Sequence, residues 1–165
     1  MNVGILTASD RAAAGAYADQ SGPLIAEILA EATDWQVTQR AVVPDELAVI
    51  AQTLAAWCAE NVQLILTTGG TGFAPRDITP EATRQIMERE APGIAEGLRA
   101  ESLKVTRHAM LSRGVAGIRG RTLIINLPGS PKAVRENMAV LLPILPHALE
   151  LLNNNPDSEQ SHRSI

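Results

Sequence analysis

Short apolar runs alternate along this chain with longer stretches in which apolar residues recur every three or four positions. The first run, residues 3–8, is followed by a polar loop and then by a helical stripe over residues 21–32. A second pair follows, an alternating run over residues 37–43 and a stripe over residues 47–60. Such runs predict strands and such stripes predict amphipathic helices. The alternation of the two predicts an α/β fold.

The most informative stretch is an apolar run, residues 64–66, that leads into Thr-Thr-Gly-Gly-Thr-Gly at residues 67–72. A run without alternation predicts a strand that is buried on both faces. Gly69, Gly70 and Gly72 have no side chain to keep a ligand from the backbone, and they permit positive φ angles. Successive amide N–H groups before a helix favour the binding of an anion.

Charged residues separate this loop from the next predicted helix. Thr79 is predicted to cap that helix and Pro80 to begin it, and the helix is expected to reach about residue 90. Arg76 and Asp77 suit a phosphate and its magnesium ion. A plain β–α turn with a surface ion pair remains the alternative. Neither the Walker phosphate loop nor the dinucleotide fingerprint matches, so the anion stays open.

The second half of the chain repeats this strand, loop and helix. Residues 114–118 and 121–127 are predicted to form an antiparallel pair of strands, and the second of them ends in Pro-Gly-Ser-Pro at residues 128–131. Ser130 is the expected cap of a helix that Pro143 and Pro146 interrupt. Either a second anion-binding helix start or a plain capped turn fits this loop.

Acidic residues also follow the first two predicted strands. Ser9 and Asp10 come directly after residues 3–8, and Asp45 follows residues 37–43. The carboxyl ends of parallel strands meet at one edge of a sheet, where ligands bind. Acidic groups that converge there suit a magnesium-dependent site. Asp45 also stands where a helix cap is wanted, so both interpretations remain open.

Composition narrows the possible functions. The 165 residues are 45% apolar, which suits one globular domain, here residues 1–152, and the polar stretch 153–165 is expected to be a disordered tail. A net charge of −4 and 2% aromatic residues disfavour nucleic-acid binding. Cys58 is the only cysteine, so no internal disulfide forms. The sequence shows no signal peptide and no apolar stretch that could span a membrane, and a cytoplasmic location is expected.

Five motifs together resemble one known family. They are Ser-Asp-Arg at 9–11, Pro-Asp-Glu at 44–46, the glycine loop at 67–72, Arg-Asp-Ile-Thr-Pro-Glu-Ala at 76–82 and Leu-Pro-Gly-Ser-Pro-Lys at 127–132. In this order they are similar to the MogA/MoaB family of molybdenum cofactor biosynthesis, particularly its molybdopterin adenylyltransferases. The resemblance implies a three-layer α/β/α domain with a mostly parallel sheet, assembled as a homotrimer.

The resemblance also implies an activity and its residues. The activity is Mg²⁺-dependent transfer of AMP from ATP to the phosphate of molybdopterin, with release of pyrophosphate. Asp45 and Asp77 match the family's acidic residues and are expected to be catalytic and to hold magnesium. The residues expected to bind nucleotide or substrate are Ser9, Asp10, Thr68, Gly69, Gly70, Thr71, Gly72, Arg76, Ser112, Pro128, Gly129 and Ser130.

Two other functions remain open at this point. The chain could be a non-catalytic molybdopterin carrier, or a purely structural domain that forms oligomers. As an enzyme it would pass its product to a molybdenum-insertion protein.

Overall fold

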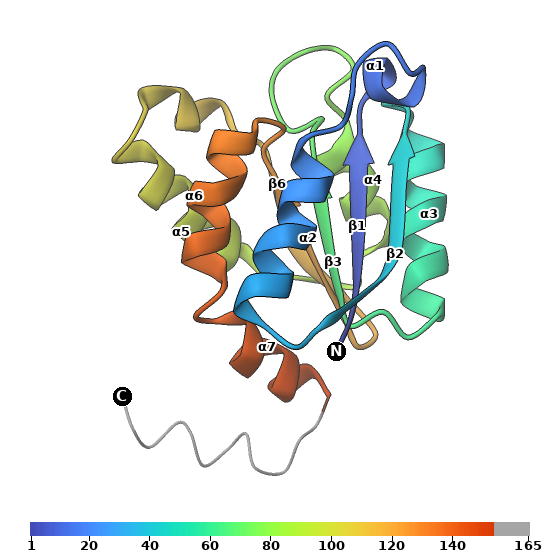
Figure 1. Ribbon diagram of the computed structural model, residues 1–165, viewed down its shortest axis with the longest axis vertical. Helices are drawn as coiled ribbons and strands as arrows, with labels where there is room; N and C mark the ends of the chain where they lie inside the picture. Colours follow the sequence, from blue (N-terminus) through green and yellow to red (C-terminus); the bar gives the residue numbers. More distant parts are fainter. Residues whose placement is uncertain (154–165) are drawn as a thin grey trace.

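The computed structural model describes residues 1–153 and shows one sheet between two layers of helices (Figure 1). The strands are β1 (Asn2–Ala8), β2 (Gln36–Val43), β3 (Leu64–Thr68), β4 (Arg89–Glu90), β5 (Ala116–Arg119) and β6 (Thr122–Leu127). The helices are α1 (Asp10–Ala13), α2 (Ser21–Ala32), α3 (Leu47–Ala59), α4 (Thr79–Ile86), α5 (Pro92–Leu103), the 3-10 helix η1 (Arg107–Leu111), α6 (Pro131–Leu141) and α7 (Leu145–Leu152). Apart from Asn153, the predicted disordered tail lies outside the described residues.

The six strands are ordered β2-β1-β3-β6-β5-β4. β2, β1, β3 and β6 are parallel to one another, whereas β5 is antiparallel to both β6 and β4. The predicted α/β fold, with a mostly parallel sheet and one antiparallel element, is therefore confirmed.

The inner parallel strands β1, β3 and β6 bury both of their faces, because successive side chains point to opposite sides of the sheet and each side is covered by helices. Ile5 and Leu66 belong to a core that α2, α5, α6 and α7 cover. Their chain neighbours Leu6 and Ile65 belong to a second core under α3 and α4. All four side chains are at most 1% exposed. The continuous apolar runs in the sequence follow from this double burial.

The fold opens a crevice where the order of the strands reverses. The chain passes from β1 to β2 through α2 on one face, and then crosses to β3 on the other side of β1 through α3 on the opposite face (Figure 1). α2, which follows β1, and α4, which follows β3, cover opposite faces of the sheet, so the chain diverges at the carboxyl ends of these two neighbouring strands. In open α/β sheets ligands bind at such a switch point. Asp45 and the glycine loop both follow strands that end at this edge.

Local structure differs from the prediction in three places. Residues expected to form a loop begin with a one-turn helix, α1, because Ser9 Oγ accepts a hydrogen bond from Ala12 N at 3.2 Å. Thr79 is not a cap: it is the first residue of α4, and Ile78 holds the cap position without a side-chain hydrogen bond. α4 also ends at Ile86, because the chain then reaches the sheet edge and pairs as β4 with β5.

The last two helices, α6 and α7, agree with the prediction. Ser130 Oγ accepts a hydrogen bond from Ala133 N at 3.3 Å and so caps α6. The predicted interruption near the two prolines separates α6 from α7, and Pro146 lies in the first turn of α7.

Asn126 on β6 joins β3, α4 and the residue that precedes β5 inside the domain. Its side chain accepts a hydrogen bond from Val115 N and donates to the hydroxyls of Thr67 on β3 and Thr83 on α4.

Asn126→Ala removes all three bonds at a site that is 5% exposed. We expect a loss of about 2–3 kcal/mol in the free energy of unfolding, measured by urea denaturation. Gln39→Ala, which removes an exposed hydrogen bond to Glu60, should cost far less. Equal losses would contradict the prediction.

Candidate functional site

A cavity of about 270 Å³ lies in the crevice at the carboxyl ends of β1 and β3. Its walls come from these strand ends, from the segment before α2 and from the loop before α6. Three carboxylates line it, those of Asp19, Asp45 and Asp77. We call it the acidic cavity.

Paired hydrogen bonds join the ends of β1 and β2 beside this cavity. Asp10 N donates to Asp45 Oδ2 at 2.9 Å, and Asp45 N donates to Asp10 Oδ1 at 3.0 Å. α3 begins after Glu46 and has no side-chain cap, so the capping interpretation of Asp45 is wrong.

Arg76 donates to both oxygens of Asp10, at 2.5 and 2.9 Å. The Arg76 guanidinium lowers the pKa of Asp10 and keeps this carboxylate ionised.

Asp45 has one carboxylate oxygen that the described residues leave without a partner. Asp45 Oδ1 and Thr79 Oγ1 are both buried and make no hydrogen bond. Both atoms lie against Gly70, where an added Cβ would be 3.0 Å from Asp45 Oδ1 and 2.3 Å from Thr79 Oγ1. Burial raises the pKa of Asp45, and the carboxylates of Asp10 and Asp77 act in the same direction. An unpaired buried carboxylate oxygen costs free energy unless a cation or donor approaches it. This arrangement fits a bound cation.

The glycine loop lies against the end of β1 and against the second predicted loop. Gly69 and Gly70 have φ angles of +92° and +62°, which residues with a side chain rarely adopt. An added Cβ on Gly69 would lie 2.3 Å from the Ala8 carbonyl oxygen. Thr68 Oγ1 donates to the Pro128 carbonyl at 2.7 Å, and an added Cβ on Gly129 would lie 3.3 Å from Gly69 Cα. The two loops that sequence patterns predict as anion-binding are therefore adjacent in space.

A second cavity, also about 270 Å³, opens on the other side of the glycine loop. α5, η1 and α6 form most of its wall, with Ala95, Leu98 and Ala109 among the apolar lining residues. Thr71 and Gly72 also line it, so consecutive residues of the loop face two different cavities. We call this one the apolar cavity.

A loop that separates two cavities at the switch point of an α/β sheet is an arrangement suited to two ligands. A sequence model of a family described as a probable molybdopterin binding domain matches residues 4–147. The chain belongs to this family.

Relatives match this chain over nearly its whole length. Gephyrin of Dictyostelium discoideum is 49% identical over 98% of the chain, which spans only 24% of gephyrin. A protein named molybdopterin adenylyltransferase from Helicobacter pylori strain J99 is 44% identical over 94% of the chain and 89% of its own length. The crystal structure of a molybdopterin biosynthesis enzyme, MoaB from Thermus thermophilus, has a TM-score of 0.88 and 52% identity, covering 93% of this chain and 97% of its own.

Most of the predicted site residues line one of the two cavities. The acidic cavity is lined by Ser9, Asp45, Thr68, Gly69, Gly70, Asp77 and Gly129. The apolar cavity is lined by Thr71, Gly72, Ser112 and Pro128. Asp10, Arg76 and Ser130 line neither. Asp10 instead bonds Asp45, Arg76 bonds Asp10, and Ser130 caps α6.

Two residues at the site were missed by sequence patterns. Asp19 lines the acidic cavity, accepts a hydrogen bond from Thr7 Oγ1 at 2.8 Å, and caps α2 through bonds from Ser21 N and Gly22 N. Arg113 contacts the glycine loop from a segment that has neither periodicity nor a motif, so nothing local marks it.

The structure adds two findings about ions and membranes. Within residues 1–153, no group of three or more His, Cys, Asp or Glu side chains is arranged to hold a metal ion. A magnesium ion at Asp45 and Asp77 would therefore take further ligands from its substrate and from water. Over the same residues, no helix combines the length and the hydrophobicity needed to cross a membrane.

Proposed function

We propose that this chain is a molybdopterin adenylyltransferase, which transfers AMP from Mg²⁺-ATP to the phosphate of molybdopterin and releases pyrophosphate. The observation that carries the proposal is the buried, unpartnered Asp45 Oδ1 in a cavity that Asp77 also lines. The 44% identity to the Helicobacter pylori adenylyltransferase over most of both chains supports the same reaction.

In this proposal Asp45 and Asp77 hold the magnesium ion. Carboxylate oxygens are the ligands that magnesium prefers, together with phosphate oxygens and water. Bound there, the ion would neutralise charge on the ATP phosphates. The hydrogen bonds between Asp10 and Asp45 fix the Asp45 carboxylate, so that Oδ2 is used within the protein and Oδ1 keeps no hydrogen-bond partner among the described residues.

The phosphate groups of both substrates would bind to the loops around Gly69–Gly72 and Ser130. Backbone N–H groups and the amino end of α6 favour anions there. An oxygen of the molybdopterin phosphate attacks the α-phosphorus of ATP, the bond to the β-phosphate oxygen breaks, and pyrophosphate leaves. This reaction needs no protein nucleophile, so the main tasks of the site are positioning and charge neutralisation.

We also propose that the chain passes its product to a molybdenum-insertion protein.

We further propose that the chain assembles as a homotrimer. Large apolar side chains are exposed where α5 ends and η1 follows, among them Val105 at 54% and Met110 at 71%. Adjacent exposed apolar side chains of this kind mark interaction surfaces. Sedimentation should give three times the 17.5 kDa mass of the chain. A monomer at micromolar concentration would contradict the assembly.

The deciding measurement is pyrophosphate release from Mg²⁺-ATP with and without molybdopterin. We expect release only when molybdopterin is present, in an amount equal to the adenylylated pterin that forms. Tight binding of molybdopterin without any release would instead support the carrier function. Absence of binding by either ligand would leave the structural alternative.

A further inference from the structure

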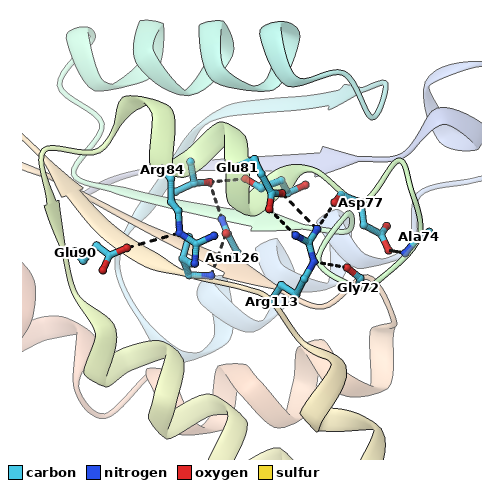
Figure 2. A network of polar contacts seen from close by, with 11 residues as sticks. Gly72, Ala74, Asp77, Glu81, Arg84, Glu90, Arg113 and Asn126 are labelled. Carbon is cyan, nitrogen blue, oxygen red and sulfur yellow. Dashed lines mark hydrogen bonds and ion pairs between the residues drawn. The ribbon is translucent and has the colours of Figure 1, made fainter.

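The guanidinium of Arg113 holds both ends of the loop that carries Asp77 (Figure 2). Arg113 Nε donates to the carbonyl of Gly72 at 2.7 Å, and Nη2 donates to the carbonyl of Asp77. The backbone N–H of Arg113 donates to the carbonyl of Thr71 at 2.9 Å. One residue, distant in sequence, therefore fixes the spacing between the start and the end of the segment 72–77.

The position of the Asp77 carboxylate depends on that spacing. Asp77 Oδ2 accepts a hydrogen bond from Ala74 N at 2.8 Å, and Asp77 N donates to the Ala74 carbonyl at 2.9 Å. An added Cβ on Gly72 would lie 2.9 Å from Asp77 Oδ2, so the carboxylate lies directly against the Gly72 backbone. A change in the distance between Gly72 and Asp77 would move the carboxylate relative to the acidic cavity.

Few packing contacts hold this segment in place. Its residues 73–76 are exposed, and the ring of Phe73 is 67% exposed. Burial therefore contributes little to the order of the segment, and polar contacts must supply it. The bonds from Arg113 join the segment to the loop that precedes β5.

A second partner orients the guanidinium. Arg113 Nη1 lies 2.5 Å from Glu81 Oε1, and Nη2 lies 3.3 Å from Glu81 Oε2, in the first turn of α4 (Figure 2). The planar guanidinium presents several donors in fixed directions, so it binds two carbonyls and a carboxylate at once. The single ammonium of a lysine cannot reproduce this set of bonds.

We propose that Arg113 is a positioning residue that acts through Asp77. By holding the carbonyls of Gly72 and Asp77 it sets the Asp77 carboxylate in the acidic cavity. The catalytic consequence rests on the proposed adenylyl transfer, whereas the structural consequence does not. Ser112 and Gly114, on either side of Arg113, line the apolar cavity, so the same residue also joins the walls of the two cavities.

The test compares Arg113→Met with Arg84→Met. Arg84 lies on the same helix as Glu81 and points toward Glu90, away from Gly72 and Asp77 (Figure 2), and its ion pair with Glu90, at 3.7 Å, is exposed. In Arg113→Met we expect kcat to fall about 30-fold, since small misplacements of a reacting group cost up to about 10²-fold. The KM for molybdopterin should change by less than about threefold, because Arg113 is not among the residues proposed to bind the substrate before it reacts. Arg84→Met should match the wild type in both parameters.

Amide hydrogen exchange supplies a readout that does not require activity. In Arg113→Met the amides of Ala74 and Asp77 should exchange at least about tenfold faster, while amides of β3 and β6 keep their wild-type rates. Exchange that accelerates equally in the core strands would show a merely structural role and overturn the proposal. If the wild type is active and Arg113→Met has the same kcat, the proposal is overturned too.

Arg113→Lys keeps the test decisive if the methionine variant does not fold. It retains the charge beside Glu81 but loses the paired bonds to the two carbonyls, so kcat should still fall about five- to tenfold. A rate equal to the wild type would overturn the proposal. If the wild-type protein releases no pyrophosphate, the proposed function fails, and exchange at Ala74 and Asp77 alone decides whether Arg113 holds the segment.

Discussion

Asp45→Asn is expected to lower molybdopterin-dependent pyrophosphate release by about 10²–10³-fold while the melting temperature stays the same or rises. The loss follows because Asn is a neutral, weaker magnesium ligand, and charge stabilisation by a metal amounts to several kcal/mol. The fold should tolerate the change, because the side-chain oxygen of Asn can still accept the hydrogen bond from Asp10 N. Steady-state rates and thermal unfolding of the same preparation measure both effects.

The charge of Asp45 explains why stability should not fall. Burial raises the pKa of Asp45 above its ordinary value of 3.8. Between that value and the raised pKa, the folded chain binds more protons than the unfolded chain, so stability falls as pH increases through this window. At neutral pH the ionised Asp45 therefore reduces stability. Asn cannot ionise, so the variant should lack this part of the pH dependence.

A matched control separates the site from general loss of charge. Asp34 is an exposed aspartate between α2 and β2, and Asp34→Asn removes the same charge far from both cavities. It should leave the rate of pyrophosphate release unchanged. If Asp45→Asn keeps a near wild-type rate, Asp45 does not hold the magnesium ion. A large drop in melting temperature would instead make Asp45 a structural residue.

The strands and the edge at which the site lies could be predicted because their causes are local. The runs 3–8 and 64–66 are apolar on both faces, which only a strand between two helical layers requires. Once those strands are parallel, residues that follow them meet at one edge whatever the details of the loops. Asp10, Asp45 and the glycine loop are close together for this reason.

The choice between two roles for Asp45 could not be made from the sequence. Its neighbours suit a helix cap as well as a ligand. The partner that decides is Asp10 N, 35 positions away, which takes one carboxylate oxygen and leaves the other without a partner. Arg113 was missed for the same reason, since its bonds reach back 36 and 41 positions to Asp77 and Gly72. Contacts between loops depend on how the whole sheet assembles.

Thr79 shows the limit of capping patterns. Threonine before proline favours a cap followed by a first helical residue. In the fold, Thr79 N instead donates to the Gly70 carbonyl at 3.1 Å, and the helix begins one residue earlier than predicted. The tertiary contact with the glycine loop outweighs a local preference of about 1 kcal/mol.

Gly69→Ala is expected to destabilise the domain by about 4 kcal/mol or more, which is exceptional for one methyl group. Two costs add at this position. The φ angle of +92° lies in a region that alanine rarely adopts, which costs about 1–3 kcal/mol. The new Cβ would also lie 2.3 Å from the carbonyl oxygen of Ala8, and this backbone atom belongs to the last residue of β1, which pairs with strands on both sides. The midpoint of urea unfolding, at constant slope, measures the loss.

Gly15→Ala isolates the first of these costs. Gly15 also has a positive φ angle, +71°, but an added Cβ there meets no atom within 4 Å. Its loss should stay near the backbone cost alone, about 1–2 kcal/mol. The difference between the two variants then measures the close approach of the glycine loop to β1. Equal losses would mean that β1 moves to admit the methyl group, and that the acidic cavity does not require a glycine at position 69 for its shape.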